Sequence, residues 1–170
     1  MKPIRARYLL PSLLIIAVAC AVHAQEKPKP TQYADVPMRD GTQLATDVYL
    51  PKGEGPWPVI LLRSTYSRNV GNMNDFLREG YAAVVQDVRG MGMSPGEKHV
   101  FYADGWREGL MDGADTTAWM LEQPWCNGRI GTFGGSALGI TQMLLAPVAK
   151  GVVAQYILSL IHISEPTRPY

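Results

Sequence analysis

The residues with the clearest potential for chemistry form a glycine-rich run around one serine, Gly134-Gly-Ser-Ala-Leu-Gly139. Between a strand and a helix, this spacing is typical of a nucleophile elbow, in which the nucleophile takes a strained backbone conformation and its neighbours are very small. The turn would lift the Ser136 hydroxyl out of a sheet at a helix N-terminus, where backbone N–H groups face a developing oxyanion. The pattern therefore predicts Ser136 as a nucleophile and the N–H of Ala137 as the first oxyanion donor.

Two other interpretations of such a turn stay open at this point. A turn of glycine and serine can simply let a strand and a helix pack closely, or it can bind phosphate. A P-loop would end in Gly-Lys-Ser or Gly-Lys-Thr, and a dinucleotide-binding loop would follow the first strand, with an acidic residue about 20 positions later. The run at 134–139 lacks the P-loop ending, and the elements before it place it after a fifth strand.

The elements that must position this run alternate between strands and helices. Two β-prone runs, at 35–38 and 44–49, flank Asp40-Gly41, which predicts a hairpin. Continuous apolar runs at 59–62 and 81–85 are typical of strands buried on both faces of a parallel sheet. The fifth strand is expected at 129–133, and helices are expected at 72–79, from 112 or 115 to 121 or 122, and at 137–146. The order β-β-β-α-β-α-β-α predicts an α/β domain with an antiparallel start and a parallel remainder.

A series of motifs runs through the same stretch, in order and with natural spacing, from about position 36 to 146. They are Pro37-Met-Arg-Asp-Gly-Thr42 with Leu44, Asp47-Val-Tyr-Leu-Pro51, Pro58-Val-Ile-Leu61 with Arg63, Tyr66, Gln86-Asp-Val-Arg-Gly90 with Ser94 and Gly96, Asp112-Gly113 with Asp115-Thr116, Trp119, Gln123-Pro-Trp125, and Asn127-Gly-Arg-Ile-Gly131. The series resembles the cocaine esterase and X-prolyl dipeptidyl-peptidase (CocE/NonD-type) family of α/β-hydrolases. The resemblance implies the N-terminal part of an α/β-hydrolase fold, with the nucleophile elbow after the fifth strand.

The resemblance also implies a Ser-Asp-His triad in which Ser136 forms an acyl-enzyme. It makes the hydroxyl of Tyr66, just after the third strand, a second oxyanion donor, because a phenol can donate to an oxyanion as a backbone N–H does. Burial statistics alone would make Tyr66 a half-buried aromatic at a strand end. Ala137 stands where many family members have tyrosine, which leaves the backbone donor in place but changes the wall of the acyl pocket.

The other triad members are expected beyond Ile157, because the chain order in this fold is Ser, then Asp or Glu, then His. His99 precedes Ser136 and is expected in a loop. His162 lies in the run 158–168, which resembles a translated sequencing adapter, although a genuine strand and tail is the alternative. We therefore expect residues 158–170 to be a non-native tail, the natural protein to continue beyond 157, and the 170-residue chain to have no significant hydrolase activity.

The first 24 residues are expected to be a secretory signal peptide. Basic residues precede an apolar run at 9–21, and Val22-His-Ala24 puts small residues before a cleavage point. That run is shorter than the about 20 residues of a membrane span. Lipidation at Cys20 is an alternative. Residues 25–32 are expected to be a polar, Pro-rich linker to a partial domain at 33–157, so we expect export to the periplasm or the medium, with no stable membrane insertion after cleavage.

Composition excludes several other classes of protein. The formal net charge is +1 and 46% of the residues are hydrophobic, which argues against a nucleic-acid binder and against a disordered tail. Two cysteines cannot build a disulfide framework and the three histidines have no ligand-like spacing, so no metal and no cofactor are expected.

Several charged residues have structural interpretations. Four acids without the ligand order of an EF-hand loop are interpreted as a solvated face with helix capping: Asp104, Glu108, Asp112 and Asp115. Asp87 and Arg89 are expected to form a salt bridge in the loop after the fourth strand or, alternatively, to face the substrate.

The sequence therefore predicts an exported serine hydrolase that acts on a small ester, an amide or a short peptide through a covalent intermediate. An alternative from another class is a secreted, non-catalytic α/β module in which Ser136 lacks activation. The choice among substrates and the oligomeric state stay open.

Overall fold

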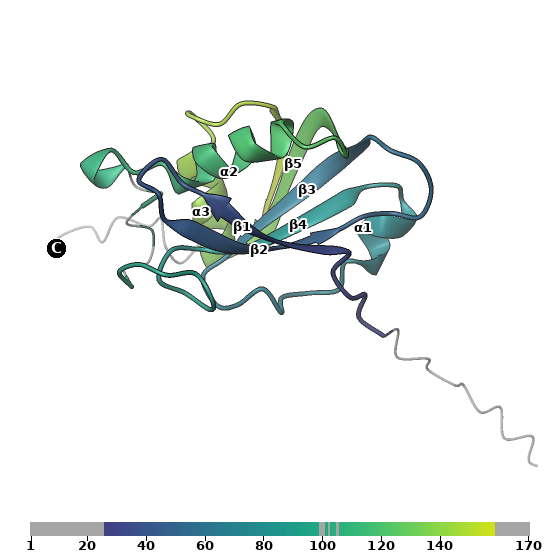
Figure 1. Cartoon of the computed structure of the whole chain (residues 1–170), viewed down its shortest axis with the longest axis horizontal. Helices are drawn as coiled ribbons and strands as arrows, with labels where there is room; N and C mark the ends of the chain where they lie inside the picture. Colours follow the sequence, from purple (N-terminus) through teal and green to yellow (C-terminus); the bar gives the residue numbers. More distant parts are fainter. Residues whose placement is uncertain (1–25, 99–100, 102, 105, 159–170) are drawn as a thin grey trace, which may run out of the picture.

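One mixed sheet of six strands forms the centre of the molecule (Figure 1). The computed structural model describes residues 26–98, 101, 103–104 and 106–158, so the predicted signal peptide and residues 159–170 of the predicted tail lie outside it. The strands are β1 (Gln32–Pro37), β2 (Gln43–Tyr49), β3 (Trp57–Ser64), β4 (Ala82–Asp87), β5 (Cys126–Gly135) and β6 (Val152–Leu158). Their order in the sheet is β1-β2-β4-β3-β5-β6. β1, β2 and β4 pair antiparallel and β4, β3, β5 and β6 pair parallel, which confirms an α/β fold with an antiparallel start.

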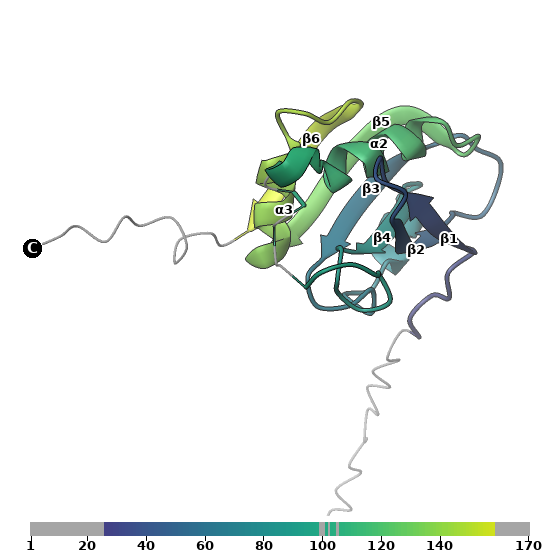
Figure 2. The same ribbon diagram turned by 60° about the vertical axis from the view of Figure 1, so that its left-hand side comes forward.

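Helices pack on both faces of this sheet, and Figure 2 labels the two that share one face. The helices are α1 (Asn74–Arg78), α2 (Asp112–Leu121) and α3 (Ala137–Leu145), with a short 3-10 turn at Arg107–Gly109. Val59 and Leu61 of β3 join a core with residues of α2 and α3, whereas Leu62 lies in a second core against α1. This alternation follows from the strand, in which successive side chains point to opposite faces. No helix in the described part of the chain has the length and apolarity needed to cross a membrane.

The structure differs from the predicted elements at some ends and by one additional strand. β5 begins at Cys126, three residues earlier than expected. α1 begins at Asn74, two residues later than expected, because the side chain of Asn72 accepts the N–H of Asn74 (3.0 Å) in a turn ahead of the helix. The sequence analysis missed β6, an edge strand that pairs with β5 and has mostly exposed side chains.

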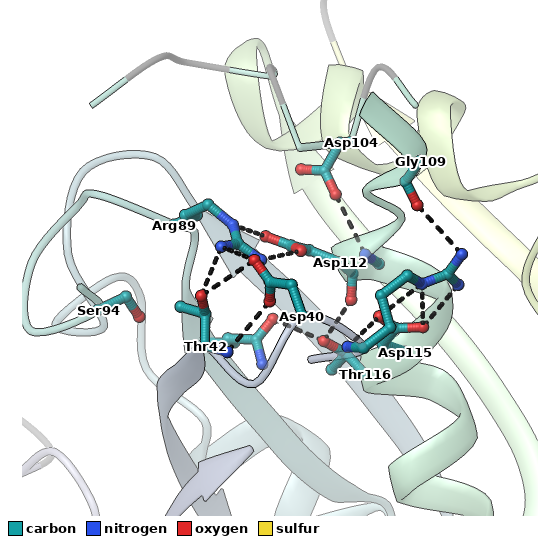
Figure 3. A network of polar contacts seen from close by, with 12 residues as sticks. Asp40, Thr42, Arg89, Ser94, Asp104, Gly109, Asp112, Asp115 and Thr116 are labelled. Carbon is teal, nitrogen blue, oxygen red and sulfur yellow. Dashed lines mark hydrogen bonds and ion pairs between the residues drawn. The ribbon is translucent and has the colours of Figure 1, made fainter. Parts of the chain in front are cut away.

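An arginine in the loop after β4 ties the β1–β2 hairpin to α2 (Figure 3). Arg89 donates to both carboxylate oxygens of Asp112 (2.8 and 2.9 Å), and to Asp40 and Thr42 (2.7 Å each). The hydrogen bond from Arg89 is the main cause that lowers the pKa of Asp40 to about 2. The expected Asp87–Arg89 salt bridge is wrong, because Arg89 is engaged by the carboxylates of Asp40 and Asp112 instead.

Two of the acids near α2 are buried. Asp104 and Asp112 are 4% and 1% exposed. Asp104 pairs with Arg63 of β3, itself almost fully buried, and accepts the N–H of Gly113 (3.2 Å). Burial raises the pKa of Asp104, and the Arg63 guanidinium opposes that shift. The predicted solvated face is therefore wrong for these two residues, because Arg63 and Arg89 compensate their charges inside the fold.

Replacement of Arg89 by methionine is expected to lower the free energy of unfolding by about 3–5 kcal/mol, because the buried carboxylate of Asp112 would lose its cation. Arg78→Met is the matched control, since Arg78 pairs with Asp75 on an exposed part of α1, where an ion pair contributes at most about 1 kcal/mol. Urea-induced unfolding of both variants and the unsubstituted chain measures the difference. An equal loss of stability in the two variants would contradict the role assigned to Arg89.

Candidate active site

The turn between β5 and α3 has the geometry of a nucleophile elbow. Ser136 is the single residue between the two elements, is exposed, and has φ 52° and ψ −121°. Such a positive φ is uncommon for a residue with a side chain and costs about 1–3 kcal/mol. Gly134 has φ 155°, and a Cβ there would lie 2.5 Å from the Cβ of Leu138. The turn therefore requires glycine at 134, and Gly139, the second small residue of the motif, is buried within α3.

Backbone groups around Ser136 leave hydrogen-bond donors at the start of α3. The N–H of Ser136 donates to the carbonyl of Leu158 on β6 (2.9 Å), and its carbonyl accepts from Gly139 (2.9 Å) and Ile140 (3.2 Å). Ala137 opens α3, and the first N–H groups of a helix have no acceptor within it. The helix dipole adds partial positive charge at the same place. The Ala137 N–H thus lies where an oxyanion donor is needed, and that role stays a prediction.

A buried glutamine in α3 clamps the turn to the sheet. The Nε2 of Gln142 donates to the carbonyls of Gly134 and Leu138 (3.1 Å each), and its Oε1 accepts the hydroxyl of Thr132 (2.6 Å). From β6, Gln155 donates to the carbonyl of Gln142 (2.8 Å). Side chains of β5, α3 and β6 therefore hold both sides of the turn. The sequence analysis missed Gln142, and the available signal was its place one helical turn after Leu138, on the face of α3 that packs on the sheet.

Tyr66 lies at the same edge of the sheet as Ser136. It follows β3, which is the parallel neighbour of β5, so the loops after these two strands open at the same edge. The Oγ of Ser64 accepts the N–H groups of Tyr66 and Ser67 (3.1 Å each) and shapes this loop. Tyr66 is 63% exposed, more than the half-buried aromatic that burial statistics favour. Its function as an oxyanion donor stays a prediction.

The described residues contain no histidine, so the structure places no histidine base beside Ser136. His23, His99 and His162 all lie outside the described part of the chain. Within that part there is also no group of three or more His, Cys, Asp or Glu side chains that could hold a metal ion. The arrangement of an exposed serine on a strained turn, with donors at the same sheet edge, suits acyl transfer once a general base is present.

The strain at Ser136 predicts an unusual order of stability for two substitutions. Ser136→Gly and Ser136→Ala both remove the hydroxyl, but glycine adopts a positive φ without steric cost, so Ser136→Gly is expected to be more stable by about 1–2 kcal/mol. At Ser67, where φ is not positive, alanine is expected to be the more stable replacement, because glycine loses more chain entropy on folding. Thermal unfolding of the four variants checks both orders. If Ser136→Ala proved the more stable at position 136, the strained turn would be contradicted.

Comparisons with known proteins agree with this architecture. A family model described as X-Pro dipeptidyl-peptidase (S15 family) matches residues 40–164. Cocaine esterase from Rhodococcus sp. (strain MB1 Bresler) is 45% identical over 126 residues, which cover 68% of this chain and 21% of that protein. The chain thus spans about a fifth of the length of this relative.

Solved structures share the fold. A CocE/NonD family hydrolase from Staphylococcus aureus superposes with a TM-score of 0.64 at 24% identity, over 72% of this chain and 26% of that chain. An aminopeptidase from the marine sediment archaeon Thaumarchaeota archaeon superposes with a TM-score of 0.63 at 26% identity, over 79% of this chain and 27% of that chain. Because the family model matches most of the described residues, the chain belongs to the X-Pro dipeptidyl-peptidase (S15) family of α/β-hydrolases.

Proposed function

We propose that the complete protein is a serine hydrolase that transfers the acyl group of an ester or amide to water through an acyl-enzyme on Ser136. The observation that carries this proposal is the strained turn at Ser136 between β5 and α3. A backbone conformation that costs stability, and that persists because buried contacts enforce it, is typical of functional sites. Membership of the family supports the same conclusion.

In the proposed reaction, the Ser136 hydroxyl attacks the acyl carbon while a general base accepts its proton. The carbonyl oxygen becomes an oxyanion, which accepts hydrogen bonds from the Ala137 N–H and the Tyr66 hydroxyl. The intermediate then expels the leaving group, which takes the proton from the base and leaves the acyl group on Ser136. Water then attacks this ester while the same base accepts a proton from it, and the second tetrahedral intermediate collapses to the acid as the base returns that proton to the Ser136 oxygen.

The general base is proposed to be a histidine oriented by an acidic residue, in the chain order that the family resemblance implies. In that order the base follows Ser136, which excludes His99, and His162 lies in the expected non-native tail, so the proposal assigns the base to a part of the protein outside these 170 residues. Without a base, a serine hydroxyl is a weak nucleophile at neutral pH. We therefore expect the chain of 170 residues to hydrolyse no ester at a significant rate.

The proposed substrates are small esters, amides or short peptides. The name of one relative, cocaine esterase, and the description of the family, X-Pro dipeptidyl-peptidase, cover ester and amide acyl donors, which share the carbonyl carbon that a serine attacks. Ala137 is half-buried directly after Ser136. Its small side chain is proposed to leave the acyl pocket wider on this side than tyrosine would.

Labelling by a fluorophosphonate tests this proposal, because the probe reacts with an activated serine hydroxyl. The complete protein is expected to be labelled at Ser136, and its Ser136→Ala variant is expected to take no label. Tyr66→Phe is expected to slow labelling by about 10²–10³-fold, the loss typical of one oxyanion donor. Tyr81→Phe is the matched control. Because Tyr81 directly precedes β4, it lies where the parallel strands begin, whereas Tyr66 follows the end of β3.

A folded, complete protein that takes no label would contradict the enzyme proposal and favour a non-catalytic module with an unactivated serine. An unchanged rate in Tyr66→Phe would remove Tyr66 from the site while leaving Ser136. Ester turnover by the 170-residue chain, lost in its Ser136→Ala variant, would contradict the assignment of the base to a part of the protein outside these 170 residues.

We also propose that the protein is exported. The support is the basic start, the apolar run at 9–21 and the small residues before position 25, all outside the described part. Expression in a secreting host, followed by N-terminal sequencing of the protein outside the cytoplasm, is expected to give Gln25 as the first residue. Retention in the cytoplasm with an uncleaved start would contradict export, and a lipid on Cys20 would indicate a membrane anchor instead.

A further inference from the structure

A cluster of buried charges lies beside the loop that carries Tyr66. Arg68, two residues after Tyr66, extends its guanidinium towards two carboxylates on neighbouring strands. Its Nε lies 3.0 Å from Oδ1 of Asp47 on β2 and 3.8 Å from Oδ2 of Asp87 at the end of β4. The side chains of Arg68, Asp47 and Asp87 are 19%, 10% and 2% exposed. One cation is therefore shared by two nearly buried anions.

This cluster is poorly satisfied. Five buried side-chain polar atoms of the described residues make no hydrogen bond, and three of them belong to this cluster: Asp47 Oδ1, Arg68 Nε and Asp87 Oδ1. The first two lie 3.0 Å apart as an ion pair but without the alignment of a hydrogen bond. Burial raises the pKa of Asp47, Arg68 opposes that shift and Asp87 adds to it. Buried polar atoms without hydrogen bonds lower the free energy of unfolding, so this ion-pair cluster contributes less to stability than a fully hydrogen-bonded one would. Arrangements that cost stability are typically retained where function needs them.

The loop is anchored on both sides of Tyr66. On one side, the Oγ of Ser64 accepts the N–H of Tyr66 (3.1 Å), and on the other, Arg68 reaches to β2 and β4. Tyr66 between them is largely exposed, so the position of its ring depends more on the loop backbone than on packing. Asp87 is itself held in place, because its Oδ2 accepts the N–H of Met93 (2.9 Å).

We propose that Arg68 is a positioning residue for Tyr66, whose ion pairs with Asp47 and Asp87 hold the loop at the sheet edge that carries Ser136. The inference rests on the proposed function and adds a residue to it. Without the guanidinium, the two carboxylates would have no cation between them and the loop would lose its second anchor. A displacement of about 1 Å in a catalytic group can cost about 10²-fold in rate, so the loss of Arg68 acts through Tyr66.

A double-mutant cycle on the complete protein separates positioning from a general effect on the fold. The measured quantity is the rate constant for phosphonylation of Ser136 by a fluorophosphonate, in Arg68→Met, Tyr66→Phe and the double variant. Arg68→Met alone is expected to slow the reaction by about tenfold or more, and by less than about twofold when Tyr66→Phe is already present. Arg78→Met, in the exposed pair with Asp75, is expected to leave the rate unchanged.

Arg68→Lys provides a second variant, which keeps the charge if Arg68→Met fails to fold. A lysine ammonium is a compact point charge, whereas a guanidinium is a planar fork that can face two carboxylates at once. Arg68→Lys is therefore expected to slow phosphonylation less than Arg68→Met does, and this slowing is also expected to disappear in the presence of Tyr66→Phe.

The outcomes are distinct. Equal slowing by the Arg68 substitutions with and without Tyr66→Phe would overturn the inference, because Arg68 would then act independently of the tyrosine hydroxyl. Slowing by Tyr66→Phe but not by either Arg68 substitution would overturn this inference alone and leave the proposed function intact. If the unsubstituted complete protein takes no label at Ser136, the proposed function fails and this inference fails with it.

Discussion

The backbone conformation of Ser136 is held against a cost of about 1–3 kcal/mol, and contacts on three sides maintain it. The carbonyl of Leu158 accepts the serine N–H from β6, Gln142 bonds to the carbonyl of Gly134 from α3, and β5 supplies the glycine that lets the helix approach. The contacts from Leu158 and Gln142 join the turn to other elements of the fold. The strained turn therefore depends on the assembled sheet, and any change that loosens β6 or α3 acts on the serine.

Because β3 and β5 pair in parallel, the loop after β3, which carries Tyr66, lies at the same end of the sheet as Ser136. The hydroxyl of Thr141 on α3 donates to the carbonyl of Arg63 near the end of β3 (3.3 Å), which ties the helix after the elbow to the strand before Tyr66. Three arginines then meet buried or nearly buried carboxylates around this edge: Arg63, Arg68 and Arg89. Arginine suits such sites because its planar, weakly hydrated fork can serve two acceptors. Ion pairs, in addition to apolar packing, thus anchor the loops at the candidate site.

The predictable parts of the protein are those with a local signal. The Asp-Gly hairpin, the buried runs of β3 and β4 and the turn at Ser136 each depend on residues close together in the sequence. β6 also carried a local signal, a run of Val, Tyr and Ile after Gly151, which the sequence analysis overlooked. No local pattern links Asp112 to Arg89, which lies 23 positions away in the sequence. The buried carboxylate of Asp112 was therefore interpreted as a solvated one. Arg68 and Gln142 were overlooked because their partners come from other elements.

The hydrogen bond from Ser136 to Leu158 has a consequence for biosynthesis. Its acceptor is the backbone carbonyl at position 158, 22 residues after its donor and the first position of the expected non-native tail, and a backbone carbonyl can serve there whichever side chain the position carries. A chain emerging from the ribosome presents the serine before the strand that completes the turn. Until β6 docks, nothing from that strand opposes relaxation of the backbone to an ordinary negative φ. A nascent chain in which β6 has not yet docked is therefore expected to hold Ser136 less firmly at its positive φ than the folded chain does.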